Sequence, residues 1–399
     1  MEPDNQGEAV FAIGAQYFLY FGVLGIFLPY FNLYCYHLGF SGFQIGLLSG
    51  LRSVTLVIFS LVWAALADRL QNRKAIYVFC SAAAAAVWTL YLTSEDFGFL
   101  LLVTMLYGIF FAPIISFLEA FTMDALNRDK RRYGQIRAWG SVSFILTVLV
   151  MGWIIDAYGI RIILMLILMG GMAQAAGSVA VPRTSRGETG KPPAEREFLV
   201  QRRTVVFMVC AFLMLVSHGT YYGFFSIHLD ALGYGKTFIG TAWALASTAE
   251  ILAMVFSERL FRRFSLESVL AVSFGVAALR WFLLAQVTSL PAILATQVLH
   301  ALTYGTFHMA SILFMDRLTP DGSKTLGQAV NNAIQYGLGL MAGFFFNGWL
   351  YETVGSFGLF AISGAIALVA LVLFLGLGRV GEDRSPEGRV VSGGPRGAK

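Results

Sequence analysis

Charged residues are scarce in this sequence. Only 13% of its 399 residues are Asp, Glu, Lys or Arg, against about 25% in an ordinary soluble domain. Hydrophobic residues make up 57% of the chain, and phenylalanine alone occurs 35 times. This composition excludes an ordinary water-soluble protein and indicates a protein of the lipid bilayer.

Cysteine is scarce as well. Cys35, Cys80 and Cys210 lie in apolar runs, where cysteine usually acts as a small hydrophobic side chain, and they form no disulfide or metal-binding pattern. The sequence also lacks a phosphate-binding glycine loop, a nucleophile paired with a base, and paired carboxylates on one helix. We therefore expect no metal, no cofactor and no enzyme activity.

Long apolar runs are what the sequence has in abundance. A transmembrane helix needs about 20 predominantly apolar residues, and twelve such runs follow one another between short polar breaks. The alternation typical of a membrane β-barrel is missing. We expect an all-α membrane protein with twelve transmembrane helices, at residues 11–36, 41–66, 75–93, 98–123, 137–155, 161–181, 204–229, 237–257, 267–287, 291–315, 326–351 and 357–378.

The basic residues predict the orientation. With both termini in the cytoplasm, 24 of the 28 Lys and Arg residues fall in cytoplasmic loops or in the tail, in agreement with the positive-inside rule. The start, Met1 to Val10, is acidic and lacks the basic region of a cleavable signal peptide. We expect a multi-pass protein of the cell (inner) membrane. The net charge of +5 then reflects topology, and no nucleic-acid partner is expected.

A polar stretch divides the helices six and six. Residues 182–203 are rich in Pro, Gly, Arg and Glu, and we expect a cytoplasmic linker there, with a short amphipathic surface helix as the alternative. The predicted domains are an N-terminal six-helix bundle at 1–181, the linker at 182–203, a C-terminal six-helix bundle at 204–378 and a disordered cytoplasmic tail at 379–399.

Two short repeats relate the halves. LGFSGFQIG at 38–46 is echoed by LGYGKTFIG at 232–240, and ADRL at 67–70 is echoed by SERL at 257–260. Both pairs occupy equivalent positions in the two halves, as in transporters built from parallel repeats. The repeats predict that the two six-helix bundles are pseudo-symmetric.

Ionisable side chains inside apolar runs need a partner or a function, because each costs about 3 kcal/mol or more in hydrocarbon. Glu119 ends one run and Arg137 begins the next, on either side of a basic loop, so we expect the two to lie at similar depth and to meet. We assign both to substrate binding. A static salt bridge between the two helices is the alternative.

A second pair, Glu250 and Arg280, is expected at matching depth in the middle of the eighth and ninth helices, with His300 facing the same region. A buried carboxylate that changes partners during a conformational cycle can carry a proton, and a histidine can relay one. We assign these three residues to proton coupling. A fixed structural pair and a packing histidine are the alternatives, and packing is the expected role of His308.

Arg52 has no acidic partner on its own helix or on the first one. We expect it to face the central cavity and to attract an anionic substrate, or else to pair with Glu119 or Glu250. Polar side chains of the seventh and eleventh helices are expected to line the same cavity, with interhelical hydrogen bonds as the alternative. These residues are His218, Tyr221, Tyr222, Asn331, Asn332 and Gln335.

The segment AALADRLQNRK at 64–74 resembles the signature between the second and third helices of the major facilitator superfamily, although it lacks both glycines of that pattern. The resemblance implies that Asp68 and Arg69 brace the cytoplasmic face in the outward-open state. The repeat in the second half gives Glu258 and Arg259 the same expected role. A loop whose basic residues only set topology is the alternative.

Over nearly the whole chain the sequence resembles the oligosaccharide:proton symporters of this superfamily. The resemblance rests on Glu119 and Arg137 with their eighteen-residue spacing, on the following Trp139-Gly140-Ser141, and on Arg280 with His300 twenty residues later. In that family the first pair contacts substrate and the second group serves coupling. Two positions differ. The coupling glutamate expected three residues after the histidine is Thr303, and the sugar-stacking tryptophan is Phe144, which remains a candidate for substrate contact.

A closer resemblance is to the 3-phenylpropionic acid permease branch, whose landmarks look like FFAPIISFLEA at 110–120, YGQIRAWGS at 133–141, SHGTYYGF at 217–224 and QVLH at 297–300. It implies a proton-coupled secondary active transporter, a symporter that imports a small organic solute by alternating access, best an aromatic carboxylate such as 3-phenylpropionate. A sugar or nucleoside symporter is one alternative. A membrane sensor or scaffold that binds without transport is another. The expected partners are a small-molecule substrate, a proton and the lipid bilayer, and we expect a monomer.

Overall fold

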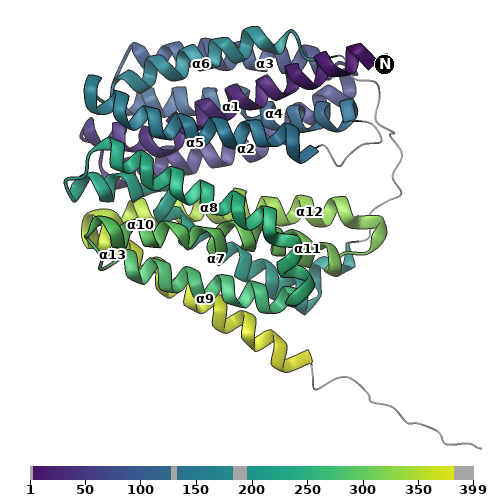
Figure 1. Ribbon diagram of the computed structural model, residues 1–399, viewed down its shortest axis with the longest axis vertical. Coiled ribbons are helices and arrows are strands. Elements are labelled where there is room, and N and C mark those ends of the chain that lie inside the picture. The colour runs from purple at the N-terminus through teal and green to yellow at the C-terminus, as the bar shows by residue number, and fades with distance from the viewer. Residues whose placement is uncertain (1–2, 127–132, 183–195, 382–399) are drawn as a thin grey trace, which may run out of the picture.

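The computed structural model describes residues 3–126, 133–182 and 196–381, so most of the predicted linker and tail lie outside the described residues. Over the described ranges the chain is helical and forms no β-strand, which confirms the predicted all-α class. Figure 1 shows the helices in two layers. The helices up to residue 178 form one layer, here called the first bundle, and those from residue 202 onward form the second bundle.

Short polar turns separate the helices of the first bundle. The second helix begins at a capping box, in which the Ser41 hydroxyl accepts a hydrogen bond from the backbone N–H of Gln44 (3.2 Å) and the Gln44 side chain accepts one from Ser41 N–H (2.9 Å). The elements are α1 Pro3–His37, α2 Gly42–Leu70, α3 Arg73–Trp88, η1 Thr89–Leu92, α4 Phe97–Leu126, α5 Tyr133–Tyr158 and α6 Ile162–Ser178.

Two π-helical segments, η4 and η6, interrupt helices of the second bundle. Such segments carry an extra residue per turn and often occur at functional sites. The elements are η3 Glu197–Val200, α7 Arg202–Ala231, α8 Lys236–Arg263, α9 Leu266–Leu284, α10 Leu290–Val298, η4 Ala301–Thr306, α11 Phe307–Leu318, η5 Asp321–Ser323, α12 Lys324–Asn332, η6 Ala333–Gly339 and α13 Leu340–Gly381.

Ten helices of the described chain are long and apolar enough to cross a membrane, and α6 is a shorter apolar helix. The last of the ten runs for 56 residues, Asp321–Gly376, which as a straight helix would span roughly 84 Å against a hydrocarbon core of about 30 Å. It is broken at Gly355, whose φ of 64° reverses the chain direction within α13. The described residues are therefore compatible with the twelve crossings predicted from the sequence.

The two bundles are in contact through the helix pairs α2 with α13 and α5 with α8. Glycine makes this close approach feasible. A Cβ atom on Gly46 would lie 2.5 Å from the carbonyl oxygen of Phe344, and one on Gly240 would lie 2.1 Å from that of Val148. These contacts lie toward the end of the molecule where α1 ends and α2 begins, here called the sealed end.

Carboxylates reinforce the sealed end by capping a helix of the opposite bundle. Asp156, near the end of α5, accepts hydrogen bonds from the backbone N–H groups of Lys236 and Thr237 (2.8 Å each) at the start of α8. Glu352, in α13, accepts one from Gly42 N–H (2.7 Å) at the start of α2. A negative charge at a helix N-terminus satisfies free N–H groups and the helix dipole. Asp156 and Glu352 occupy equivalent places in the two halves, and we call them the capping carboxylates.

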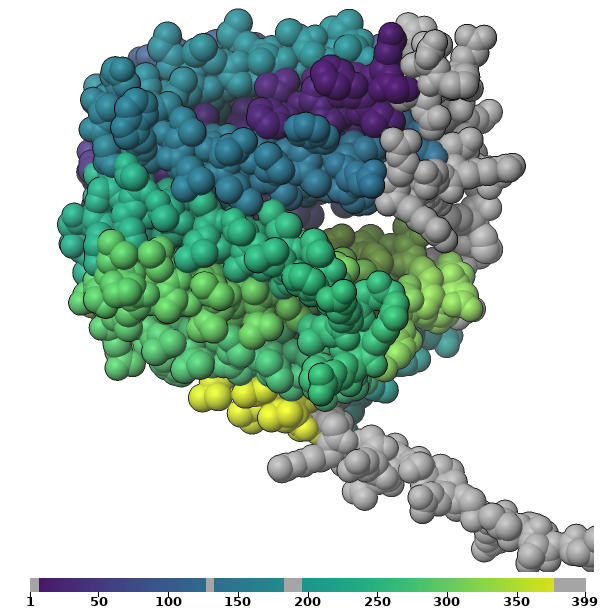
Figure 2. Space-filling view, viewed as in Figure 1, coloured from purple at the N-terminus to yellow at the C-terminus, as the bar shows by residue number. Residues whose placement is uncertain are grey.

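The opposite end is open. Figure 2 shows the two bundles separating toward the side on which the chain begins, which leaves a cleft between them. The predicted gating residues lie there, and the contacts of Asp68, Glu258 and Arg259 within the described part of the chain stay inside their own bundles. Asp68 pairs with Arg73 of its own bundle (3.2 Å), Glu258 pairs with a neighbour on its own helix, and the Arg259 guanidinium lies over the Phe256 ring. Their gating role stays a prediction.

Candidate functional site

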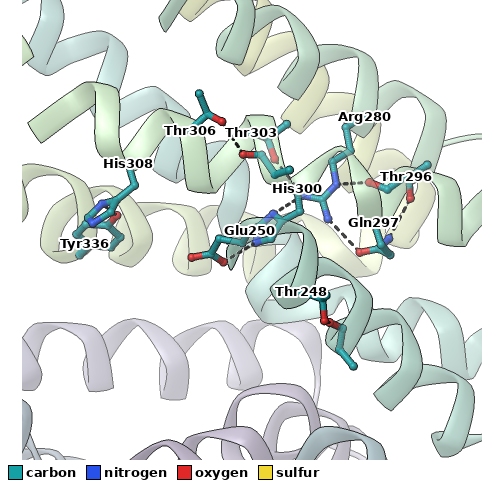
Figure 3. Close-up of polar contacts among 12 residues, drawn as sticks. Thr248, Glu250, Arg280, Thr296, Gln297, His300, Thr303, Thr306, His308 and Tyr336 are labelled. Carbon is teal, nitrogen blue, oxygen red and sulfur yellow. Dashed lines mark hydrogen bonds and ion pairs between the residues drawn. The ribbon is translucent and has the colours of Figure 1, made fainter. Parts of the chain in front are cut away.

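Arg280 is the centre of a buried polar network in the second bundle (Figure 3). Its side chain is fully buried and its guanidinium has three good acceptors. Nε donates to the carbonyl oxygen of Thr296 (2.9 Å), Nη1 to His300 Nδ1 (2.8 Å) and Nη2 to Gln297 Oε1 (3.0 Å). Tyr221 lies with its ring 4.5 Å from the guanidinium carbon. A planar cation held on several sides in this way has one orientation.

His300 lies between Arg280 and Glu250. Because Arg280 donates to Nδ1, the proton of the neutral imidazole is on Nε2, which lies 3.7 Å from Glu250 Oε2. The sequence predicted that Glu250 and Arg280 would pair directly, and this is wrong for the present conformation. Arg280 stands only one turn before the end of α9, and its long side chain reaches the imidazole instead of the carboxylate. The three residues form a row that we call the coupling row.

The π-helical segment η4 starts directly after His300 and shapes this row. Gly305 allows η4 to pack against α8 at Glu250, since a Cβ there would lie 3.0 Å from Glu250 Cγ and 3.1 Å from its carbonyl oxygen. Thr303, which stands where the resemblance expects a coupling glutamate, accepts a hydrogen bond from Arg280 Nη1 (3.3 Å). The family's second acid is thus replaced by a neutral acceptor, which leaves Glu250 as the carboxylate of the row.

Aromatic side chains extend the row along the same wall. The Tyr304 ring is stacked between the imidazoles of His300 (centroids 5.2 Å apart) and His308 (6.2 Å). The hydroxyl of Tyr336 bonds to His308 Nδ1 at 2.7 Å. Tyr304 and Tyr336 were not identified from the sequence, although His300, Tyr304 and His308 recur at the i, i+4 spacing that places side chains on one helix face.

Glu119 and Arg137 do not form an ion pair in this conformation. Glu119 is exposed and Arg137 is half-buried, with its guanidinium 4.1 Å from the centre of the Phe21 ring. A static salt bridge, the alternative reading, is therefore not observed either.

Arg52 forms no ion pair with a carboxylate among the residues that the structure describes. Its guanidinium lies over the Phe27 ring (4.2 Å), and its Nε is buried with no hydrogen-bond partner among the described residues. Pairing with Glu119 or Glu250, the alternative prediction, is not observed. Arg52 lines a cavity of about 30 Å³ to which both bundles contribute, since Tyr222 and Phe344 reach it from the second one.

The other predicted substrate contacts divide into two groups. His218 and Tyr221 are fully buried beside the coupling row rather than free in the cleft, and Nδ1 of His218 bonds to the carbonyl oxygen of Met214 (2.8 Å). Tyr222 lines the Arg52 cavity, and its role in substrate binding stays a prediction. Phe144 is partly buried and packs against the hydrophobic core.

The amides of the eleventh crossing serve mainly as links between helices. The side-chain nitrogens of Asn331 and Gln335 lie 3.2 and 2.7 Å from the Ser311 hydroxyl on α11, so the interhelical alternative describes them. Asn332 is exposed. Sequence periodicity could not distinguish residues that line the cavity from residues that link helices here. The π-helical segment η6 follows directly and changes which face of the helix points inward.

A cleft that opens at one end between two helical bundles, with polar and charged side chains of apolar helices on both sides, is an arrangement typical of membrane transporters. The chain belongs to the MFS_1 like family, whose model matches residues 11–362. The protein is thus a multi-pass membrane transporter of the major facilitator superfamily, and the resemblance described from the sequence is confirmed.

Individual relatives agree with this assignment. The chain is 29% identical, over 90% of its length and 95% of the relative's, to a protein of Escherichia coli K12 described as a probable 3-phenylpropionic acid transporter. It is 24% identical to the maltose permease of Geobacillus stearothermophilus, over 90% and 92% of the two chains. Among solved structures, the nucleoside transporter NupG matches with a TM-score of 0.81 at 14% identity, over 93% of this chain and 99% of that one, which shows the fold.

Proposed function

We propose that this transporter imports an aromatic carboxylate such as 3-phenylpropionate together with a proton. The observation that carries the proposal is the coupling row, in which one carboxylate, Glu250, faces a histidine whose other nitrogen is occupied by Arg280. A protonatable group inside a membrane bundle is costly and is typical of proton pathways. The relative described as a probable 3-phenylpropionic acid transporter supports the substrate class.

Glu250 can couple protonation to the movement of the bundles. It belongs to the second bundle and lies 3.7 Å from Nε2 of His300, whose other nitrogen accepts from Arg280. A proton on Glu250 removes its charge, and with it any attraction to arginines of the first bundle, and weakens the interaction with His300. The relative free energies of the open and closed cleft therefore depend on the proton, which is the requirement for coupling.

The orientation follows from the basic residues. The described Lys and Arg residues gather at the open end, for example in the turn after α2 and at the end of α8, whereas Arg161 and Lys236 lie at the sealed end. The positive-inside rule then places the open end and both termini in the cytoplasm. We therefore propose that the conformation is inward-open, and we propose further that the protein acts as a monomer in the inner membrane.

The experiment is uptake of labelled 3-phenylpropionate into proteoliposomes. With an acidic outside and a neutral lumen, the protein accumulates the label several-fold above the outer concentration, and a protonophore abolishes the accumulation. Equal uptake with and without the pH gradient removes proton coupling from the proposal. No uptake of any aromatic carboxylate removes the substrate class.

A sugar or nucleoside is the second candidate. Glu119 and Arg137 stand apart in the cleft, where they supply an acceptor and a donor to hydroxyl groups, and the relatives include a maltose permease and a putative nucleoside transporter of Escherichia coli K12. Uptake of labelled maltose and uridine in the same vesicles tests it. Binding of any of these compounds without flux would instead support a sensor or scaffold.

A further inference from the structure

The charges inside the membrane-spanning helices do not balance. Glu250 is joined to Arg280 through His300, and Glu119 and Arg137 stand in the first bundle without an ion pair between them. Two glutamates thus accompany these two arginines. Arg52 is left over, because no ion pair joins it to a carboxylate in the described part of the chain. An unmatched cation at this depth is costly, and one negative charge beside it would restore neutrality.

The surroundings of Arg52 fit an aromatic anion. Phe27, under the guanidinium, is stacked on Phe31 with 4.5 Å between ring centroids, and Trp88 and Tyr91 close the wall behind Phe31 (6.0 and 5.5 Å). The buried Nε of Arg52 has no partner, so Nε and the adjacent Nη form the edge that a carboxylate binds with two parallel hydrogen bonds. An aromatic wall directly beside this edge would hold a ring two or three carbons away.

Both bundles build this cavity at their junction. Asn32 of α1 donates to the carbonyl oxygen of Gly223 in α7 (3.1 Å) and accepts from the Ser49 hydroxyl of α2 (3.1 Å). Tyr222 and Phe344 of the second bundle complete the lining. A site shared between the bundles changes size whenever they rock, which a transported ligand requires.

We propose that Arg52 and the Phe27–Phe31 wall form the subsite that binds the carboxylate and the ring of the substrate. The proposal rests on the proposed function and selects Arg52 over Arg137 as the anion site. Arg52 is favoured because its buried Nε has no hydrogen-bond partner among the described residues, a position that an anion would fill, whereas Arg137 is only half-buried and has no such buried, unpaired atom.

The size of the cavity implies that affinity for the substrate differs between the two conformations. At about 30 Å³ it has room for a water molecule and is too small for an arylpropionate. When the bundles separate at the sealed end, Tyr222 and Phe344 move away with the second bundle, so the subsite is large enough for the substrate only in that conformation. Affinity for the anion is therefore high with the sealed end open and low in the conformation seen here, in which substrate leaves through the cleft.

The test compares a carboxylate with its neutral amide. Binding of 3-phenylpropionate and 3-phenylpropionamide to the purified full-length protein is measured by isothermal titration for wild type, for Arg52→Gln, for Arg137→Gln, which removes the competing anion site, and for the matched control Arg161→Gln, an exposed arginine paired with Glu95. We expect wild type, Arg137→Gln and Arg161→Gln to bind the carboxylate at least tenfold more tightly than the amide. We expect Arg52→Gln to lose this preference while it still binds the amide, which also shows that the variant is folded.

Three outcomes would contradict the proposed subsite. If Arg52→Gln keeps the tenfold preference for the carboxylate, or if Arg137→Gln loses this preference, the anion is bound elsewhere while the proposed substrate class stands. If wild type shows no preference for any of a panel of arylalkanoates over their amides, the substrate class fails together with the subsite. Loss of the preference in Arg52→Gln with uptake that ignores the pH gradient leaves the subsite in place and removes only proton coupling.

Discussion

At the scale of single residues, Glu250 is the side chain whose chemistry the proposed mechanism needs most. Glu250→Gln keeps the shape and hydrogen-bonding capacity of a protonated glutamate but cannot release a proton. We expect concentrative, gradient-driven uptake to fall at least tenfold, while exchange of labelled for unlabelled substrate across the vesicle membrane persists, because exchange needs no net proton release.

His308→Gln is the comparison for this variant. His308 lies two turns from His300 on the same wall and bonds to Tyr336, but it does not contact Glu250 in the coupling row. We expect the His308→Gln variant to retain more than half of the gradient-driven uptake. Equal losses in exchange and in net uptake for Glu250→Gln would contradict its role as the proton carrier.

Arg280 makes a prediction about stability. Lysine cannot reproduce a planar fork that donates to Thr296, Gln297 and His300 at once, so Arg280→Lys leaves buried acceptors without donors. We expect the free energy of unfolding in mild detergent to fall by about 2 to 3 kcal/mol.

The control is Arg161→Lys, in an exposed pair with Glu95 (2.9 Å), where we expect a change below about 0.5 kcal/mol. If both substitutions have the same small effect, the Arg280 network is not a fixed structural element.

The sequence identified the members of the coupling row but not their order. Glu250, Arg280 and His300 were predicted because ionisable groups in apolar runs are expensive. Depth counted along a helix ignores how far a side chain reaches, and the π-helical turn after His300 changes the rotation of that helix. Neither effect has a recognisable sequence signal here, which is why the histidine was not expected between the two charges.

At the scale of helices, the capping carboxylates hold the bundles together at the sealed end. Asp156 accepts from two backbone N–H groups at the start of α8 and from the Thr237 hydroxyl (2.7 Å). Asp156→Asn removes the negative charge and one acceptor, which weakens the contact by about 1 to 2 kcal/mol. The population with the sealed end open should therefore rise roughly fivefold to thirtyfold.

Labelling measures this shift. A cysteine at Ser49, which lines the Arg52 cavity, should react correspondingly faster with a membrane-impermeant maleimide added outside. Asp96→Asn is the matched control, because Asp96 caps α4 of its own bundle by accepting from Phe99 N–H (2.9 Å). An unchanged labelling rate in Asp156→Asn would show that glycine packing alone closes this end.

The helix ends were predicted well where polar turns are short and capped, as at the expected start at residue 41 and the observed start of α2 at Gly42. The last two expected helices, 326–351 and 357–378, are joined in the structure with only Gly355 out of helical conformation between them. The contacts between the two carboxylates and the opposite bundle could not be predicted, because they depend on how the bundles dock.

At the scale of the whole molecule, substrate class and electrical behaviour are linked. One proton entering with one monocarboxylate carries no net charge, whereas one proton with a sugar or nucleoside carries +1. We expect uptake of 3-phenylpropionate to follow the pH gradient and to change less than twofold when a potassium diffusion potential of 100 mV, worth about 2.3 kcal/mol per charge, is imposed.

The converse result points to the second candidate. If a negative interior potential raises uptake severalfold without a pH gradient, positive charge enters with the substrate. That result would favour a neutral substrate, or more than one proton for each anion.

The connections at the sealed end are short, so this face of the carrier exposes few loop residues. α1 ends at His37 and α2 begins at Gly42, α5 ends at Tyr158 and α6 begins at Ile162, and Gly355 alone marks the final reversal. An antibody fragment or macrocyclic inhibitor directed at this face finds helix tips rather than flexible loops. A ligand that binds helix ends of both bundles at once would prevent them from separating. It would inhibit the transporter without entering the permeation path.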